Sequence, residues 1–74
     1  MDTTVELETD SIPLSALLKL AGAAESGGQA KHLVVEGHVT VNGEAETRRG
    51  AKIRPGDQVV VALPGVPEVR IRVA

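Results

Sequence analysis

Four cationic residues lie within seven positions and form the part of the sequence best suited to binding a polyanion. They are Arg48, Arg49, Lys52 and Arg54, with no acidic residue among them. Arginine binds phosphate oxygens through paired hydrogen bonds, and lysine binds them as a point charge. We therefore expect this loop to contact a nucleic-acid backbone. The alternative is a solvated surface loop whose charges offset nearby glutamates, Glu44 and Glu46.

A second candidate anion site lies at the start of a predicted helix. Ser26 and Gln29 have the spacing of a capping box, and Gly27 and Gly28 stand between them. Free amides at a helix N-terminus attract phosphate, and Lys31 is placed one turn inside to reach it. The spacing is not that of a Walker loop. A plainly capped helix with a solvated lysine is the alternative.

Residues that could catalyse a reaction or hold a metal are few. His32 and His38 lack the spacing of a helical metal site, and the chain contains no cysteine. Asp57 follows Pro55-Gly56 and is expected to be a turn residue. No serine lies in a known nucleophile motif. We therefore expect no enzymatic activity, no metal and no cofactor.

The composition favours a small binding module. The 74 residues carry a net charge of -2 and are 42% hydrophobic, which predicts one folded domain over 1–74. Residues 1–47 sum to -6 and residues 48–74 to +4, so the positive charge is local. Without Phe, Tyr or Trp, nucleic-acid modules that stack bases on aromatic platforms are disfavoured. No apolar run could span a bilayer and no secretory signal is recognisable, so we expect a cytoplasmic protein without membrane contact.

Two short amphipathic helices are predicted to position the second site. Asp10 and Ser11 offer N-cap oxygens to the first helix, Pro13 suits its first turn and Gly22 ends it. The second helix runs from the capping box to Gly37. Both helices repeat apolar residues at i, i+3, i+4 and i+7. These stripes are Leu14, Leu17, Leu18 and Ala21, then Ala30, Leu33, Val34 and Gly37.

Short strands are predicted around the cationic loop. Asn42-Gly43 is a strong signal for a type I′ hairpin, and Ile53 is expected to anchor the loop as a single apolar residue. The fold class is therefore α+β, with two short helices packed on a small, mainly antiparallel sheet. The strands are expected over 3–8, 38–41, 44–47, 58–63 and 68–73.

The first and last strands are expected to be neighbours in this sheet. Their outward residues would then face each other, Glu6 and Glu8 opposite Arg70 and Arg72. In that arrangement the last two arginines form ion pairs and do not bind a ligand.

Most of the chain, from about residue 12 to residue 63, resembles a known family. The motifs that carry the resemblance are Leu17-Leu18-Lys19-Leu20-Ala21-Gly22, Ser26, Ala30-Lys31-x-Leu33-Val34-x-x-Gly37-x-Val39-x-Val41-Asn42-Gly43 and Pro55-Gly56-Asp57-x-Val59. They resemble the RNA-binding domain named after ribosomal small-subunit protein S-four. The stretches Glu25–Lys31 and Glu46–Arg49 are similar to its stand-alone YbcJ-like branch.

This resemblance implies a helix–turn–helix on a small sheet, the αL motif, and binding of structured RNA that is ribosomal or tRNA-like. Many relatives have Ser-Arg where this chain has Ser26-Gly27, which leaves more of the binding to the remaining cations. From the resemblance and the residue patterns together, the expected RNA-binding residues are Lys19, Ser26, Gly27, Gly28, Gln29, Lys31, Asn42, Arg48, Arg49, Lys52 and Arg54.

The sequence thus predicts a monomeric, non-enzymatic protein that binds structured RNA, with the ribosome as a candidate partner. Binding would depend on phosphate charge and RNA shape, and would therefore weaken with salt. The alternative function is a protein-interaction module that docks through its edge strands.

Overall fold

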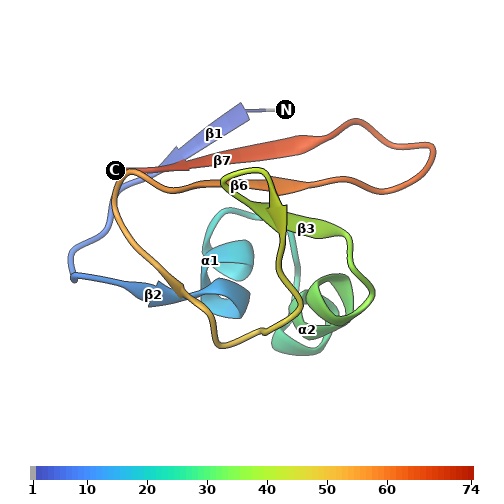
Figure 1. Cartoon of the computed structure of the whole chain (residues 1–74), viewed down its shortest axis with the longest axis horizontal. Coiled ribbons are helices and arrows are strands. Elements are labelled where there is room, and N and C mark those ends of the chain that lie inside the picture. Colours follow the sequence, from blue (N-terminus) through green and yellow to red (C-terminus); the bar gives the residue numbers. More distant parts are fainter. Residues whose placement is uncertain (1) are drawn as a thin grey trace.

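A sheet with two helices against one face makes up the fold in the computed structural model, which describes residues 2–74 (Figure 1). The predicted α+β class, with helices on a mainly antiparallel sheet, is confirmed. The elements in chain order are β1 (Asp2–Val5), β2 (Ile12–Pro13), α1 (Leu14–Leu20), α2 (Gly27–Val35), β3 (Val39–Val41), β4 (Glu44–Ala45), β5 (Lys52–Ile53), β6 (Gln58–Val61) and β7 (Val69–Val73).

The main sheet has the strand order β1-β7-β6-β3-β4. Only the β1–β7 pair is parallel, and the first and last strands are neighbours as predicted. Several strands are shorter than expected, because alternation reveals an apolar face but not where the partner strand ends. The strand predicted over 3–8 ends at Val5, and those predicted over 44–47 and 58–63 end at Ala45 and Val61.

The predicted ion pairs of Glu6 and Glu8 with Arg70 and Arg72 are wrong. The parallel register places Asp2 opposite Arg70 and Thr4 opposite Arg72, while both glutamates follow the end of β1. The cause is the packing of Val5 and its register partner Val73, which are both buried and so fix the alignment.

Most of the two predicted stripes is buried, and only their last residues, Ala21 (half-buried) and Gly37 (exposed), lie beyond the helix ends. Gly22 and Gly37 have φ values of +80° and +81°, which fits their predicted role at the helix ends. Ile53 is 1% exposed, so the predicted anchor of the loop is confirmed. The buried core comprises Val5, Leu14, Leu17, Leu18, Ala24, Ala30, Leu33, Val34, Val39, Ile53, Val59, Val61, Ile71 and Val73.

The start of α1 differs from the prediction. Asp10 and Ser11 do not cap this helix, because Ile12 and Pro13 form β2 and pair with Ile53 and Lys52 of β5. The N-cap position belongs to Pro13, whose side chain accepts no hydrogen bond. A strand partner forty residues away in the sequence therefore decides where the helix begins.

Asp57 connects the hairpin turn between β3 and β4 to the turn that precedes β6. Asn42 and Gly43 have φ values of +51° and +86°, as the predicted type I′ hairpin requires. The Asp57 carboxylate accepts a hydrogen bond from Asn42 Nδ2 at 3.0 Å and another from the Arg54 amide at 2.8 Å. The Arg54 amide first, then the Asn42 side chain, lower the pKa of Asp57. Asn42 Oδ1 in turn accepts from the Gln58 amide at 2.9 Å.

Asp57→Asn is expected to lower the free energy of unfolding by about 1–2 kcal/mol at neutral pH, because it weakens two hydrogen bonds to a charged acceptor. The pKa of Asp57 lies below its ordinary 3.8 in the folded protein, so its charge stabilises the fold above that value. This contribution is lost as the pH falls below 3.8 through the folded pKa. Urea unfolding at several pH values should show the two proteins converging in acid; a difference that stays constant contradicts this role.

Candidate nucleic-acid interface

The cationic loop is tied to the first turn of α1 by backbone hydrogen bonds. The amide of Leu14 donates to the carbonyl of Ala51 at 2.8 Å, and the amide of Ser15 donates to the carbonyl of Arg49 at 3.0 Å. These carbonyls satisfy amides that a helix start otherwise leaves without acceptors. The loop therefore has a fixed place on the helical side of the sheet, and the start of α1 is not available to an anion.

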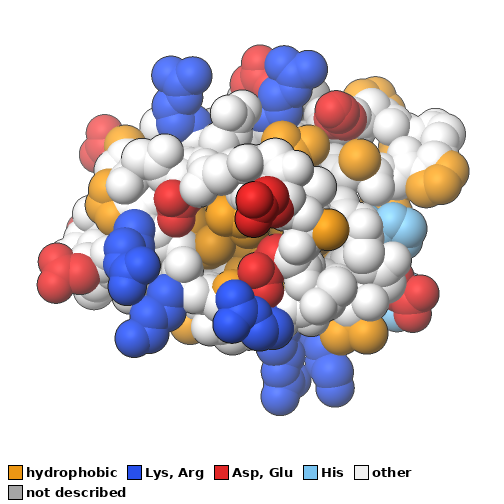
Figure 2. All heavy atoms as spheres, viewed as in Figure 1, with side chains coloured by type: hydrophobic (Ala, Val, Ile, Leu, Met, Phe, Trp, Pro, Cys, Tyr) orange, Lys and Arg blue, Asp and Glu red, His pale blue; other side chains and the backbone are white. Residues whose placement is uncertain are grey.

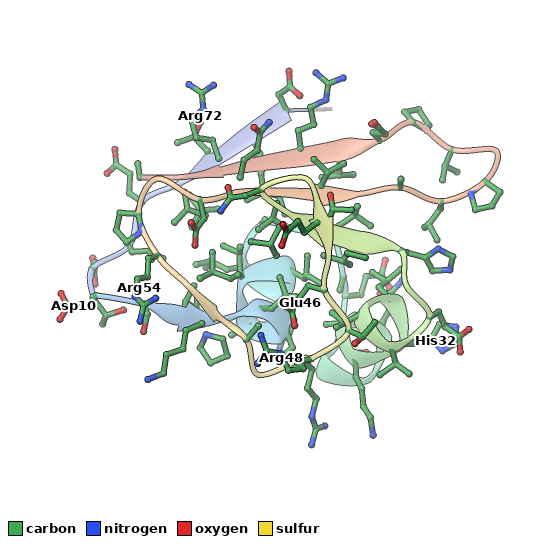
Figure 3. All side chains as sticks on the ribbon, viewed as in Figure 1. Asp10, His32, Glu46, Arg48, Arg54 and Arg72 are labelled. Atoms are coloured by element: carbon green, nitrogen blue, oxygen red, sulfur yellow. The ribbon has the colours of Figure 1, made fainter. Side chains whose placement is uncertain are left out.

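The side chains of this loop are exposed and lie around an open hollow. Ile53 is buried between Lys52 and Arg54, so the strand alternation turns these two cations outward. Arg48 and Arg54 both lie on the helical side of the sheet in Figure 3. The hollow is lined by Arg48, Gly50, Ala51, Lys52 and Arg54.

One of the four cations has an acidic partner within the protein. Arg48 Nε lies 2.8 Å from Glu46 Oε1, and the Arg48 amide donates to the same oxygen at 3.1 Å. These contacts lower the pKa of Glu46 and raise that of Arg48. A nearby glutamate therefore offsets the charge of Arg48 in the free protein, and this glutamate is Glu46 and not Glu44. Within residues 2–74, Arg49, Lys52 and Arg54 form no ion pair.

The start of α2 forms the capped helix that the sequence predicts. Ser26 Oγ accepts a hydrogen bond from the Gln29 amide at 3.1 Å. Gln29 Oε1 accepts from the Glu25 amide at 2.6 Å, one residue earlier than in a standard capping box. The next two amides, of Gly27 and Gly28, donate to no acceptor in the described part of the chain. They remain available to an external anion.

Neither glycine is required by the fold at this helix start. Neither has a positive φ. An added Cβ would meet nothing within 4 Å at Gly27, and at Gly28 only Ser26 Oγ at 3.9 Å. Glycine in a helix nevertheless costs up to about 1 kcal/mol relative to alanine. The conformation and packing of the helix start therefore do not account for glycine at these two positions.

The remaining predicted residues take different positions. Lys31 is exposed on α2, and Lys19 is exposed in the last turn of α1, beside Ala16 and Leu20. Asn42 uses its side-chain amide to join the hairpin to Asp57, which makes it a positioning residue for the loop. Nothing in its sequence context separates this role from RNA contact.

Lys and Arg side chains gather along one margin of the face drawn in Figure 2, where Figure 1 places β5, the cationic loop and the helices. Arg72 lies on the opposite side of the sheet in Figure 3. Across residues 2–74, no three His, Asp or Glu side chains are grouped to hold a metal. No helix of the described chain is long and apolar enough to cross a membrane.

Comparison with known proteins decides the family. A family model described as the S4 domain matches residues 5–71. The chain belongs to the S4 domain family. The resemblance expected over residues 12–63 is confirmed, and the match extends into β1 and β7, which the sequence motifs did not include.

Three proteins with related sequences are similar to this chain over half or more of its length. The chain is 41% identical over 61 residues to the probable ribosome maturation protein RlbA of Bacillus subtilis, covering 82% of this chain and 86% of that protein. It is 49% identical over 51 residues to the putative RNA-binding protein YbcJ of Escherichia coli, covering 69% and 73%. Small ribosomal subunit protein uS4 of Thermus thermophilus is 46% identical over 41 residues, 55% of this chain but only 20% of that protein.

A solved structure supports the same fold. The solution structure of YbcJ from E. coli, described as having an αL motif involved in RNA binding, matches with a TM-score of 0.65 at 38% identity. The match covers 93% of this chain and 85% of that chain. The predicted αL arrangement is thereby confirmed.

Neutralising the loop is expected to leave the fold intact. Arg48→Gln, Arg49→Gln and Lys52→Gln together should change the free energy of unfolding by less than about 1 kcal/mol, since exposed charges contribute little to stability. Ile53→Ala, within the same segment, should lower it by about 2–5 kcal/mol because Ile53 is buried. Urea unfolding measures both, and a triple variant as unstable as Ile53→Ala contradicts the surface assignment.

Proposed function

We propose that this protein binds structured RNA, ribosomal or associated with the ribosome, and catalyses no reaction. Its contacts are with the phosphate backbone and the shape of the RNA. The sequence has no Phe, Tyr or Trp, so the chain lacks the aromatic platforms on which other RNA-binding modules stack bases.

The observation that carries the proposal is the cationic loop fixed on the first turn of α1. Backbone hydrogen bonds at 2.8 and 3.0 Å hold the loop, and Arg49, Lys52 and Arg54 extend from it without acidic partners in residues 2–74. Placing these cations before binding reduces the entropy lost when the RNA arrives.

The α2 N-terminus supplies a second point of contact. We infer that the amides of Gly27 and Gly28 hold one phosphate, and that Lys31 adds its charge one turn further along. The loop cations hold other phosphates on the same side of the sheet. Arg48 joins them when RNA phosphate displaces Glu46, and Lys19 contributes at the edge of the interface.

The names of the relatives support RNA as the ligand. One relative is a probable ribosome maturation protein, one is a putative RNA-binding protein, and a third is a ribosomal protein. We extend the proposal to ribosomal RNA on this basis, with a tRNA-like fold as the second RNA to be tested. Binding as a monomer, through one domain and in the cytoplasm, completes the proposal.

Affinity for a ribosomal RNA hairpin should fall steeply with salt. With about four phosphate contacts, the slope of log K against log salt is expected to be roughly -3 to -4. Arg49→Gln with Lys52→Gln should make the slope less negative by about 2. Each phosphate contact that is lost removes about one counterion from those released on binding. Fluorescence anisotropy at several salt concentrations measures both slopes.

The matched control for this experiment is Val66→Glu with Pro67→Glu. It changes the net charge by the same amount in the exposed β6–β7 turn, away from the loop. Its slope should stay close to that of the wild type. Weak, salt-insensitive binding in the wild type would instead favour docking of a protein on the edge strands β1 and β4.

Gly28→Ala should separate folding from binding. The added methyl group has free space, so the free energy of unfolding should rise by about 0.4–1 kcal/mol. The same methyl group blocks the approach of phosphate to the helix start, so affinity for the hairpin should fall. Ala16→Gly, an alanine on α1, serves as a control that lowers stability only. A Gly28→Ala protein with unchanged affinity would remove the α2 N-terminus from the interface.

A further inference from the structure

The face of the main sheet that points away from the helices carries two arginines without partners. Arg70 and Arg72 are exposed, while Ile71 and Val73 between and after them are buried in the core. Neither guanidinium group forms an ion pair or hydrogen bond within residues 2–74. No element of the described chain covers this face, since both helices pack on the other one (Figure 1).

The strand register explains why these arginines stay unpaired. Asp2 is opposite Arg70 but forms no ion pair with it, and Thr4 is opposite Arg72. On the other side of β7, Gln58 is the partner of Arg72. The ion pairs with Glu6 and Glu8 that the sequence favoured are therefore not formed.

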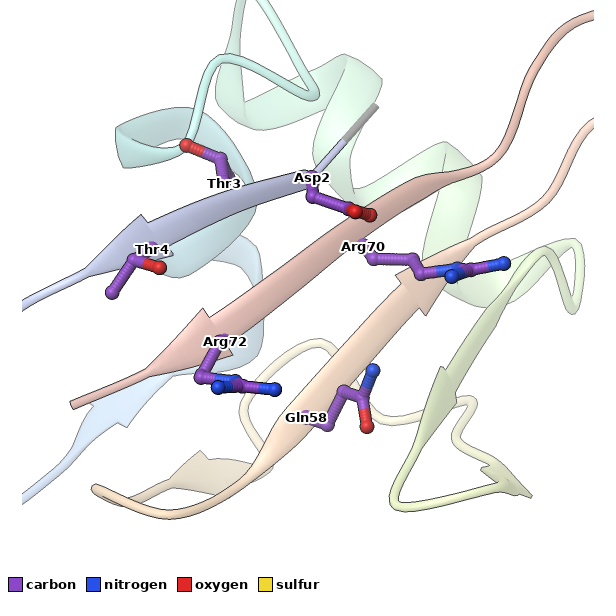
Figure 4. A pocket seen from close by; sticks show the side chains of 6 residues that line it. All are labelled: Asp2, Thr3, Thr4, Gln58, Arg70 and Arg72. Atoms are coloured by element: carbon purple, nitrogen blue, oxygen red, sulfur yellow. The ribbon is translucent and has the colours of Figure 1, made fainter.

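Together these side chains form an open hollow across three strands. Figure 4 shows Arg70 and Arg72 along β7, with Thr4 on β1 and Gln58 on β6. The hollow is lined by Asp2, Thr3, Thr4, Gln58, Arg70 and Arg72.

The two arginines of this hollow can bind phosphate groups in a row, and they outnumber its one carboxylate, Asp2, which lies opposite Arg70. Residues two apart on a strand are about 6.6–6.8 Å apart and point to one face, so the two guanidinium groups can each fork onto a separate phosphate. The hydroxyl of Thr4 and the amide of Gln58 add neutral donors beside them. The lining of the hollow contains no aromatic side chain, so contacts to the phosphate backbone are expected to dominate.

We propose that this outer face, defined by Arg70, Arg72, Thr4 and Gln58, binds the phosphate backbone of a second RNA segment. Arg72 lies on the opposite side of the sheet from Arg48 and Arg54 (Figure 3). A rigid RNA helix on the cationic loop cannot reach both sides, so the protein bridges two segments. This inference rests on the proposed function for its first segment.

The test is a two-step capture. A ribosomal RNA hairpin is fixed to a surface and saturated with protein, and a fluorescent second hairpin is then added. The wild type should retain the second hairpin. Arg70→Gln with Arg72→Gln should still bind the fixed hairpin, but retain roughly tenfold less of the second one at physiological salt. Val66→Glu with Pro67→Glu, which changes the net charge equally, should retain it like the wild type.

The experiment distinguishes failure of the proposed function from failure of the bridging proposal. A wild type that does not bind the fixed hairpin overturns the proposed function. A wild type that binds it but captures no second hairpin, or a double variant that captures as much as the wild type, overturns the bridging proposal alone. Capture of poly-glutamate in place of RNA, lost in the double variant, would assign this face to an acidic protein and also overturn it.

Discussion

The capping of α1 by the cationic loop is the constraint on which the interface depends. Leu14 is fully buried, and its amide has no partner within its own helix. The carbonyl of Ala51 provides that partner, and the carbonyl of Arg49 does the same for Ser15. One set of hydrogen bonds therefore completes the helix and fixes the cations, which makes the geometry of the binding surface part of the stability of the fold.

The C-terminal end of the cationic loop is held by polar contacts to Asp57. Its carboxylate joins the hairpin turn at Asn42 to the turn at Arg54. Ile53 is buried between the two cations of β5. The cationic segment is thus held at both ends and in its middle, by the cap on α1, by the Asp57 contacts and by one apolar side chain. Such a segment can present charge without relying on ion pairs for its shape.

Charge is divided between the two sides of the sheet. The helical side bears the cationic loop and the free amides of α2, while the outer side bears Arg70 and Arg72. The net charge of -2 conceals both groups. Glu46 offsets one loop cation in the free protein. Local excess charge, and not the sum over the chain, is what a phosphate backbone meets at each face.

The sequence alone determined the helices, the type I′ hairpin and the capping of α2, because these depend on residues within a few positions of one another. It also identified the S4-type resemblance. It did not predict that Pro13 would take the N-cap position, that Glu46 and not Glu44 would pair with Arg48, or that Glu6 and Glu8 would lie beyond the end of β1, away from Arg70 and Arg72. Those outcomes were decided by tertiary structure: the pairing of β2 with β5 and the parallel register of β1 join segments tens of residues apart, and only the packing of their buried side chains fixes that alignment.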